Sequence, residues 1–356
     1  MSTPTVVEQI LDLARWAPSG DNTQPWRFEV LDDSNVVVHG FDTREHCVYD
    51  LDGRPSQISL GALLETMAIA ATAHGLRTQV HRRTNADEAR PTFDVHFAPD
   101  SELGVDPLVG AITARCVQRR PMRMRALDDA QMQVLVRAIG PDHRVVWLQG
   151  VGAKLRTALL LFGYAKLRLT MPEAYSVHRD IIQWRARFSV DRIPDRALGI
   201  DPISAALMHF VMRTWGRVKF FNRFLAGTWM PRIQMDLVPG LACATHFLIL
   251  ARHEPTTTDD YVAAGRAMQR FWLTLTLQGL YMQPSLTPLI FSRYERQATR
   301  FSSDPTSRRL SAHLADRLVA LVGHETARAA VFMGRLGASA APTSRSLRRE
   351  LPDILV

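Results

Sequence analysis

Residues 17–28 read APSGDNTQPWRF, and this stretch joins an expected helix to an expected pair of strands. The preceding segment, residues 3–17, carries apolar side chains at helical spacing, and we expect Thr3 to cap that helix. Strands are expected over residues 26–31 and 35–41, where β-branched and aromatic residues gather. The stretch between them is therefore predicted to be a tight turn whose small side chains leave backbone N–H groups free.

Two later segments echo each other. Residues 61–76 read GALLETMAIAATAHGL, and residues 265–280 read GRAMQRFWLTLTLQGL. Both open with glycine, close with Gly-Leu and share a threonine at the same place, Thr72 and Thr276. Each is a predicted helix after a polar loop and before an extended segment. We interpret the chain as two related halves with a junction near residues 105–112; two unrelated amphipathic helices that both end in glycine are the alternative.

The rest of the chain fits this division with one exception. Residues 143–239 have no counterpart in the first half, so we expect one unit over 1–108 and a second over 109–356, with an insertion at about 151–240. The remaining expected elements are helices at 59–74, 128–139, 151–169 and 174–188, and strands at 78–83, 92–97, 241–251 and 329–336.

The charge of the chain has an unusual composition. The formal net charge is +8, and lysine occurs only at positions 154, 166 and 219, so 40 of the 43 cationic residues are arginines. The planar guanidinium group suits phosphate or carboxylate binding, although a coding bias toward arginine would give the same count. No helix-turn-helix, RRM or zinc-finger pattern is present, so we expect no nucleic-acid partner.

Neither a membrane span nor a metal site is expected. The most apolar stretch, residues 203–225, contains four cations, and one arginine at the centre of a span costs about 2.5–3.5 kcal/mol. Two interpretations of this stretch stay open: a packed helix, and an amphipathic helix over a pocket or on a membrane surface. Three dispersed cysteines, no HExxH motif and no signal-like leader favour a cytoplasmic protein without disulfides or zinc.

The stretch at residues 17–28 resembles the FMN-binding signature of the nitroreductase superfamily, A-P-S-x-x-N-x-Q-P-W-x-F. The RxxxR run at Arg115 and Arg119, the segment 265–284 and the finish RLGASAAPTSRSLRREL at 335–351 extend the resemblance over most of the chain. The resemblance is to the Acg-like branch. It implies an α+β fold, a three-layer α/β/α sandwich with mainly antiparallel sheets, in which two fused halves form an intramolecular pseudo-dimer.

The resemblance also implies where FMN would bind. Each half lacks what the other supplies, because the first has the PSxxN loop without the arginine run and the second has the reverse. One composite site is therefore expected, with the opposite site inactive. The loop would contact the flavin ring. Two arginines of the RxxxR run and an arginine of the tail would bind the phosphate, and a backbone segment would lie against the edge of the flavin. These residues are Pro18, Ser19, Gly20, Asn22 and Gln24; Arg115, Arg119, Arg345 and Arg348, with Arg349 next in order; and Gln283, Pro284 and Ser285.

The implied activity is ping-pong hydride transfer from NADH or NADPH through FMN to a small planar electrophile such as a nitroaromatic, a quinone or an enone. No catalytic side chain is expected, because the cofactor carries the bond chemistry. Residues 192–202 and the following helix are candidate lid elements. Two alternatives stay open: FMN storage under a closed lid without NAD(P)H turnover, and a dedicated flavin redox step in a biosynthetic pathway. The chain would act as a monomeric pseudo-dimer or as a higher dimer.

Overall fold

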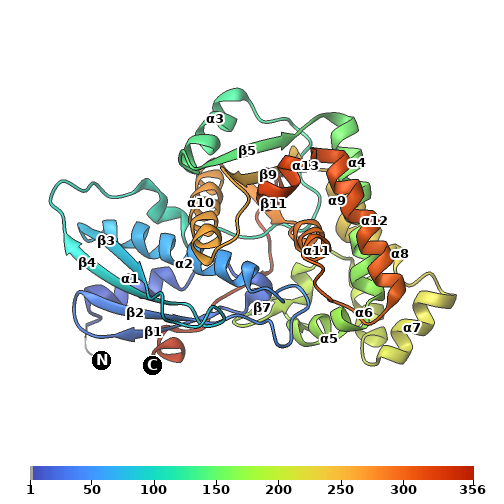
Figure 1. The fold of residues 1–356 in the computed structure, drawn as a ribbon, viewed down its shortest axis with the longest axis horizontal. Coiled ribbons are helices and arrows are strands. Elements are labelled where there is room, and N and C mark those ends of the chain that lie inside the picture. Colours follow the sequence, from blue (N-terminus) through green and yellow to red (C-terminus); the bar gives the residue numbers. More distant parts are fainter. Residues whose placement is uncertain (1–2) are drawn as a thin grey trace.

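Two antiparallel sheets, with a helix pair between them, organise the chain (Figure 1). The structure is a computed structural model and describes residues 3–356. Sheet A has the strand order β1-β2-β4-β3, and its strands are β1 (Trp26–Val30), β2 (Asn35–Gly40), β4 (Thr92–Pro99) and β3 (Leu76–Arg82). Sheet B has the order β5-β9-β11-β10, and its strands are β5 (His143–Leu148), β9 (Thr245–Ala251), β11 (Ala330–Ala338) and β10 (Leu280–Pro284). Every neighbouring pair in both sheets is antiparallel.

The same order of elements occurs twice along the chain. Helix α1 (Val6–Ala14) is followed by β1, β2, helix α2 (Arg54–Thr72), β3 and β4. Helix α3 (Asp129–Ala138) is followed, with insertions, by β5, β9, helix α10 (Thr258–Leu277), β10 and β11. Because the two sheets also share their strand order, the internal echo in the sequence corresponds to a repeat in topology. The exact boundary at residue 108 stays a prediction.

Helices α2 and α10 cross at the glycines that open the two echoing segments. A Cβ atom on Gly61 would lie 2.0 Å from the carbonyl oxygen of Val262, and one on Gly265 would lie 2.1 Å from that of Ile58. Val262 and Ile58 each precede their glycine by three residues, so the same contact is made in both directions. Such reciprocity is typical of a two-fold interface, and here it joins two segments of one chain.

Sheet B is covered by helices on both faces. On one face Phe247 packs against Phe271 of α10, with ring centroids 4.7 Å apart. On the other face Leu248 belongs to a core cluster with Leu160 of α4 (Gly150–Thr170) and Leu314 of α12 (Pro305–Val322). Successive residues of a strand point to opposite faces, so these contacts define the expected three-layer sandwich.

Sheet A differs from that expectation, because within residues 3–356 helices pack on one of its faces only. Trp26 and Phe28 of β1 are buried in the core cluster with α1 and α2. The alternate residues Arg27 and Glu29 lie on the other face, where Glu29 bonds His39 of β2 at 2.8 Å. The fold is thus α+β with mainly antiparallel sheets, as expected, and the three-layer arrangement applies to sheet B.

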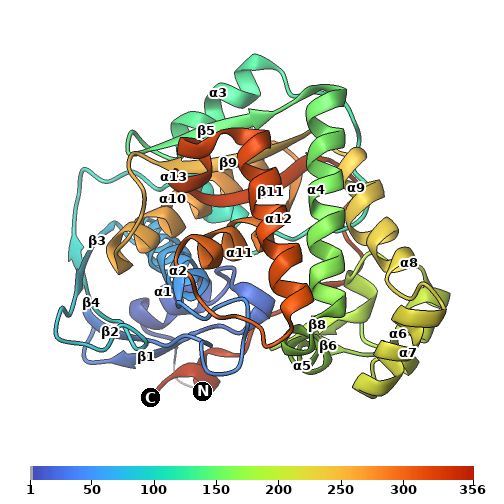
Figure 2. The same cartoon turned by 45° about the vertical axis from the view of Figure 1, so that its right-hand side comes forward.

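The second half contains two insertions (Figure 2). The first lies between β5 and β9, and the second, between β10 and β11, was not predicted as a helical insertion. The first comprises α4, α5 (Pro172–Ile181), β6 (Ile182–Gln183), β7 (Phe188–Ser189), β8 (Ile193–Pro194), α6 (Pro202–Val211), α7 (Trp215–Phe224), α8 (Trp229–Arg232), the π-helical turn Ile233–Leu237 and α9 (Val238–Leu241). The second comprises α11 (Thr287–Arg296), α12 and α13 (His324–Ala329).

Several predicted helix bounds are wrong for local reasons. The cap of α1 is Thr5 rather than Thr3, because Thr5 and Glu8 form a reciprocal capping box. Helix α5 ends at residue 181 instead of 188, since the following residues form the short strands β6 and β7. The stretch 203–225 is two helices, because Thr214 caps a new one. Within residues 3–356, no helix is long and apolar enough to cross a membrane.

The C-terminal tail returns to the first half. Leu351 and Ile354 are buried in the core cluster beneath sheet A, and Leu355 pairs with Phe28 of β1. Earlier in the tail, β12 (Arg345–Ser346) pairs with β7 of the insertion. The expected second unit therefore supplies part of the core of the first, because the apolar tail residues are buried there.

Candidate functional site

A cavity of about 370 Å³ lies where the two halves and the first insertion meet. Small-molecule sites are typically clefts of roughly 300–1,000 Å³. Its wall includes the loop after α1, the first turns of α2, the segment after residue 114, α10, the end of β10 and the tail. Apart from Arg349, which does not line the cavity, twelve site residues were predicted, and ten of them line it: Pro18, Ser19, Gly20, Asn22, Arg115, Arg119, Gln283, Pro284, Arg345 and Arg348.

The loop after α1 has a constrained backbone. Asp21, Asn22 and Gln24 all have positive φ angles, of 51°, 64° and 52°, and such conformations cost energy in residues other than glycine. The loop is held by hydrogen bonds: the backbone N–H of Gln24 donates to Ser19 Oγ at 2.9 Å, and its side-chain amide donates to the Val190 carbonyl at 2.8 Å. These hydrogen bonds hold the strained loop in one conformation at the wall of the cavity.

Two predicted site residues do not line this cavity. Gln24 is fully buried and ties the loop to the insertion and to the tail, where its Oε1 accepts from the backbone N–H of Arg349 at 2.9 Å. Ser285 lies beside a smaller neighbouring cavity of about 80 Å³, and its backbone N–H donates to the Met333 carbonyl. Both therefore position the walls instead of lining the larger cavity.

The predicted RxxxR arginines lie in the wall, Arg115 buried and Arg119 half-buried, and within residues 3–356 neither forms an ion pair. Arg115 is 3% exposed, donates to the Trp16 carbonyl at 2.8 Å and stacks over the Trp272 ring at 4.6 Å. Its Nε is buried without a hydrogen-bond partner. Arg119 donates to the Ala197 carbonyl at 3.3 Å. Each guanidinium group is thus anchored by backbone carbonyls and keeps hydrogen-bonding capacity.

The tail arginines complete the same group. Arg345 donates to the carbonyls of Thr113 and Arg115, and its Nε is also buried without a partner. Arg348 is buried and donates to the Ala17 carbonyl and to Oδ1 of Asn22, both at 2.9 Å. The tail therefore connects the loop of the first half to the arginine run of the second.

The four arginines of this wall, Arg115, Arg119, Arg345 and Arg348, form what we call the arginine group. Among the described residues 3–356, none of them is paired with a carboxylate within 4.0 Å. Burial lowers the pKa of Arg115 to about 10 and that of Arg348 well below its usual value. Positive charge that is withdrawn from water without an ion-pair partner is costly, so this group favours an anionic ligand such as a phosphate.

The end of β10 presents a further unsatisfied polar atom. Gln283 lines the cavity and donates from Nε2 to the Pro284 carbonyl at 2.9 Å, while its Oε1 is buried without a partner. Met282 is fully buried in the core, and its carbonyl accepts from the backbone N–H of Gln118. The strand is thus fixed by its neighbours, and its last residues face the cavity.

Sequence reasoning missed a second set of polar residues on the same wall: Asp21, Tyr49, His178, Arg168 and Asp236. Burial raises the pKa of the Asp21 carboxyl. Asp21 lies inside the loop motif at residues 17–28, so its position in the motif could have identified it as a candidate. The others are isolated in the sequence, and three of them belong to the insertion, so only the fold brings them together.

The insertion covers one side of the cavity. The expected lid segment contributes Ile193, Ala197 and Leu198, and helix α6 and the residue after it contribute Met208 and Met212. The lid residues thus lie at the cavity. Within residues 3–356, no group of three or more His, Cys, Asp or Glu side chains is arranged to hold a metal ion.

Comparison with known proteins finds one matching family model and several similar proteins. Residues 3–138 match the model of the nitroreductase family. The chain is 23% identical over 292 residues, 80% of its length, to "Uncharacterized protein MT1398" of Mycobacterium tuberculosis (strain CDC 1551 / Oshkosh). It is 28% identical over 305 residues to "Putative NAD(P)H nitroreductase Rv3131" of Mycobacterium tuberculosis (strain ATCC 25618 / H37Rv), covering 83% of this chain and 79% of that protein.

A shorter match supports the Acg-like resemblance. The chain is 31% identical over 101 residues to "Putative NAD(P)H nitroreductase acg" of Mycobacterium tuberculosis (strain ATCC 25618 / H37Rv), covering 28% of this chain. The matched regions span only 39% of the length of MT1398 and 30% of that of Acg. The family model over residues 3–138, the names of Rv3131 and Acg, and the loop at the wall of the cavity all point to the same similarity, which is to the nitroreductase family.

Proposed function

We propose that this chain binds one FMN in the composite cavity and uses it as an oxidoreductase. The arginine group carries the proposal, because its two buried and two half-buried guanidinium groups form no ion pair within residues 3–356, and two of them have unpartnered Nε atoms, which fits the phosphate of FMN. The cavity volume of about 370 Å³ suits a ligand of this size.

The residues around the cavity divide between the parts of the cofactor. Arg115, Arg119, Arg345 and Arg348 would hold the phosphate. The strained loop with Ser19, Gly20 and Asn22, and the strand end with Gln283 and Pro284, would contact the ring system. Bound FMN would supply reversible hydride and electron transfer, while the protein positions it and excludes water.

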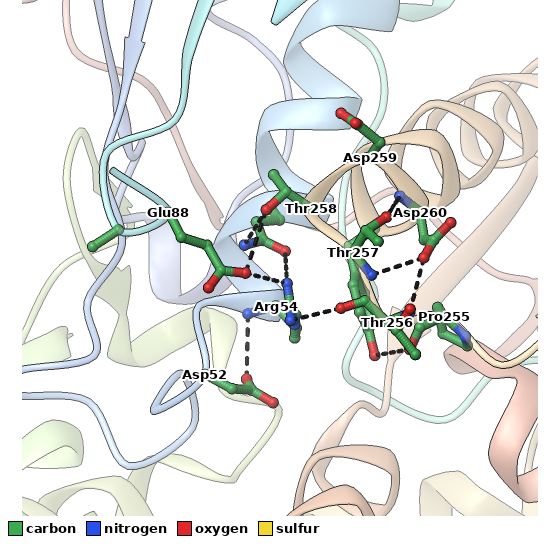
Figure 3. Close-up of polar contacts among 12 residues, drawn as sticks. Asp52, Arg54, Glu88, Pro255, Thr256, Thr257, Thr258, Asp259 and Asp260 are labelled. Atoms are coloured by element: carbon green, nitrogen blue, oxygen red, sulfur yellow. Dashed lines mark hydrogen bonds and ion pairs between the residues drawn. The ribbon is translucent and has the colours of Figure 1, made fainter. Parts of the chain in front are cut away.

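Only one such site is proposed for each chain. The echo of the sequence relates Pro55 and Ser56, which line the cavity, to Asp259 and Asp260 at the start of α10. At the place in the second half that corresponds to Pro55 and Ser56, the Asp260 carboxylate accepts from the backbone N–H groups of Thr256 and Thr257, both at 2.8 Å (Figure 3).

The same region contains further acidic and paired groups. Arg54 donates to Glu88 and to the Thr256 carbonyl, both at 2.8 Å (Figure 3). Asp259 forms an ion pair with Arg82 at 2.6 Å. Carboxylates that already accept these bonds would disfavour a second phosphate.

NADH or NADPH is the proposed reductant, and a small planar electrophile such as a quinone, a nitroaromatic or an enone is the proposed oxidant. The names of Rv3131 and Acg as NAD(P)H nitroreductases support this assignment. A second candidate is FMN storage without turnover, which the insertion residues at the cavity favour, because a closed lid would exclude a nicotinamide. A dedicated biosynthetic redox step is compatible with the same site.

One titration separates these functions. Purified protein is saturated with FMN, freed of excess by gel filtration, and treated anaerobically with NADH or NADPH while the visible spectrum is recorded. We expect one FMN per chain and loss of the flavin absorbance on addition of reductant. Flavin that stays oxidised would favour storage, and protein that retains no FMN, or about two per chain, would contradict the one-site model.

A further inference from the structure

The cavity holds a second polar group that the FMN assignment does not use. Arg168 of α4 bonds to Asp236 at 3.0 Å, from Nη2 to Oδ1, so the pair adds no net charge. Its Nε is buried without a hydrogen-bond partner. In contrast to the arginine group, this guanidinium is already neutralised and would favour a polar but uncharged ligand atom over a second anion.

Tyr49 and His178 lie on the same wall and are bonded to each other. The distance from the Tyr49 hydroxyl to His178 Nε2 is 2.9 Å, and the two rings stack with centroids 5.8 Å apart. The edge of Phe291 packs against Tyr49 at 6.0 Å between centroids. These contacts fix the phenol ring. The positive charge of Arg168 acts on both residues and favours a lower pKa for each of them. Tyr49 comes from the first half and His178 from the insertion, so folding alone creates the pair.

The protonation state of this pair determines which hydrogen bonds it can donate to a ligand in the cavity. Burial, with the charge of Arg168, lowers the pKa of His178 to about 3, so the imidazole is neutral near pH 7. A neutral imidazole has one N–H. If Nε2 carries it, the ring donates to the Tyr49 oxygen, and the phenol proton is free to donate into the cavity.

The lining around these groups is apolar and adaptable. It consists of aliphatic and methionine side chains of the insertion, namely Leu169, Ile181, Ile182, Met208, Met212 and Met235. Methionine adjusts to ligands of varied shape. This lining fits the hydrophobic body of a small aromatic molecule better than a charged one.

We propose that Tyr49, Arg168 and His178 form an acceptor subsite, which binds an uncharged aromatic or enone molecule through a carbonyl or nitro oxygen. The Tyr49 hydroxyl and the Arg168 guanidinium donate to that oxygen, and the six apolar residues contact the body of the molecule. His178 is a positioning residue, because it acts by orienting the Tyr49 hydroxyl. This subsite rests on the proposed oxidoreductase function and deepens it, since it specifies what the oxidant must carry.

The test is a binding measurement without turnover. The full chain, loaded with oxidised FMN and kept free of reductant, is titrated by calorimetry with menadione and with 2-methylnaphthalene, which lacks both carbonyl oxygens. Tyr49→Phe should weaken menadione binding about threefold to tenfold, as expected for one hydrogen bond, and leave 2-methylnaphthalene unchanged. Tyr281→Phe is the matched control, because Tyr281 does not line the cavity.

Two histidine variants separate positioning from general damage. His178→Leu removes the donor and should weaken menadione binding as Tyr49→Phe does, whereas His178→Gln keeps an N–H toward Tyr49 and should restore most of it. FMN content and the melting temperature are measured for each variant.

The subsite is overturned if wild-type protein binds both probes equally, or if Tyr49→Phe leaves menadione affinity unchanged. Failure of the oxidoreductase proposal gives a different result. In that case the protein still binds menadione more tightly than 2-methylnaphthalene, but NAD(P)H does not reduce its flavin.

Discussion

Replacing Gly61 by alanine tests whether the crossing of α2 and α10 holds the two halves together. The new Cβ would lie 2.0 Å from the Val262 carbonyl oxygen, whereas ordinary contacts begin at 3.4 Å. The helices would have to separate by more than 1 Å, and because the obstacle is backbone, no side-chain rotation relieves it. Overpacking typically costs 1–3 kcal/mol, and the better helix propensity of alanine offsets about 1 kcal/mol. We expect a net loss of up to about 2 kcal/mol.

The assay is urea unfolding followed by circular dichroism, with FMN content measured in parallel. Separation of the helices should also lower FMN content, since Ile58 of α2 and Trp272 of α10 both line the cavity. The matched control is Gly152→Ala in α4, where a Cβ would meet nothing within 4 Å; there we expect no loss and a gain of up to about 1 kcal/mol.

The double variant Gly61→Ala/Gly265→Ala sharpens the test. The two new Cβ atoms occupy the same narrow space, so the second should cost less than the first once the helices have moved. A Gly61→Ala protein with the unfolding midpoint and FMN content of wild type would refute the proposed role of this crossing.

The other predictions concern the arginine group, the stoichiometry and pH. Arg115→Ala and Arg119→Ala should each weaken FMN binding by about 1.5–3 kcal/mol, while the exposed neighbour variant Arg120→Ala should not; wild-type FMN retention in the double variant would contradict the assignment. The FMN-to-chain ratio after gel filtration should be near one, and phosphate-free riboflavin should bind much more weakly than FMN. Burial lowers the pKa of His178 to about 3 and of His246 to about 4, so the unfolded chain binds protons that the native chain does not. Stability should then fall as pH drops from about 6.5 toward 4, by roughly 1.4 kcal/mol per pH unit for each histidine; urea midpoints against pH should show a smaller slope in His178→Gln, and an unchanged slope would contradict the assignment.

Patterns short enough to lie within one segment determined much of the fold. The spacing of apolar residues predicted six of the eight strands of the two sheets within a few residues, and the echo identified the two glycines that meet at the helix crossing. Strand β10 was expected only as an extended segment, and β5 was missed, because residues 143–239 were interpreted as having no counterpart in the first half although β5 occupies the position of β1. Local bonding set the exact ends of helices, and there the sequence predictions were less accurate. Thr5 replaced Thr3 as the cap because Glu8 completes its bonding, which is a competition between neighbouring residues that periodicity alone does not resolve.

The candidate site shows the same division. The loop at residues 17–28 and the arginines were predictable because they belong to contiguous motifs, and the fold places most of them around one cavity. Gln24 was expected at the cavity because an amide suits a flavin edge, yet its side chain is buried as a tie between the loop, insertion and tail. A motif specifies a residue's neighbours in sequence, and burial depends on segments that pack from elsewhere.

Motifs and spacing along the chain were enough to predict the repeat of two halves and the members of the arginine group, and the family resemblance implied the antiparallel α+β class. Two features became visible in the folded chain alone: the tail crosses into the first half, and Tyr49 contacts His178, which lies 129 positions away in the sequence. The physical reason is that periodicity and turn chemistry act over a few residues, whereas a cavity wall is made by side chains whose proximity depends on how whole elements pack.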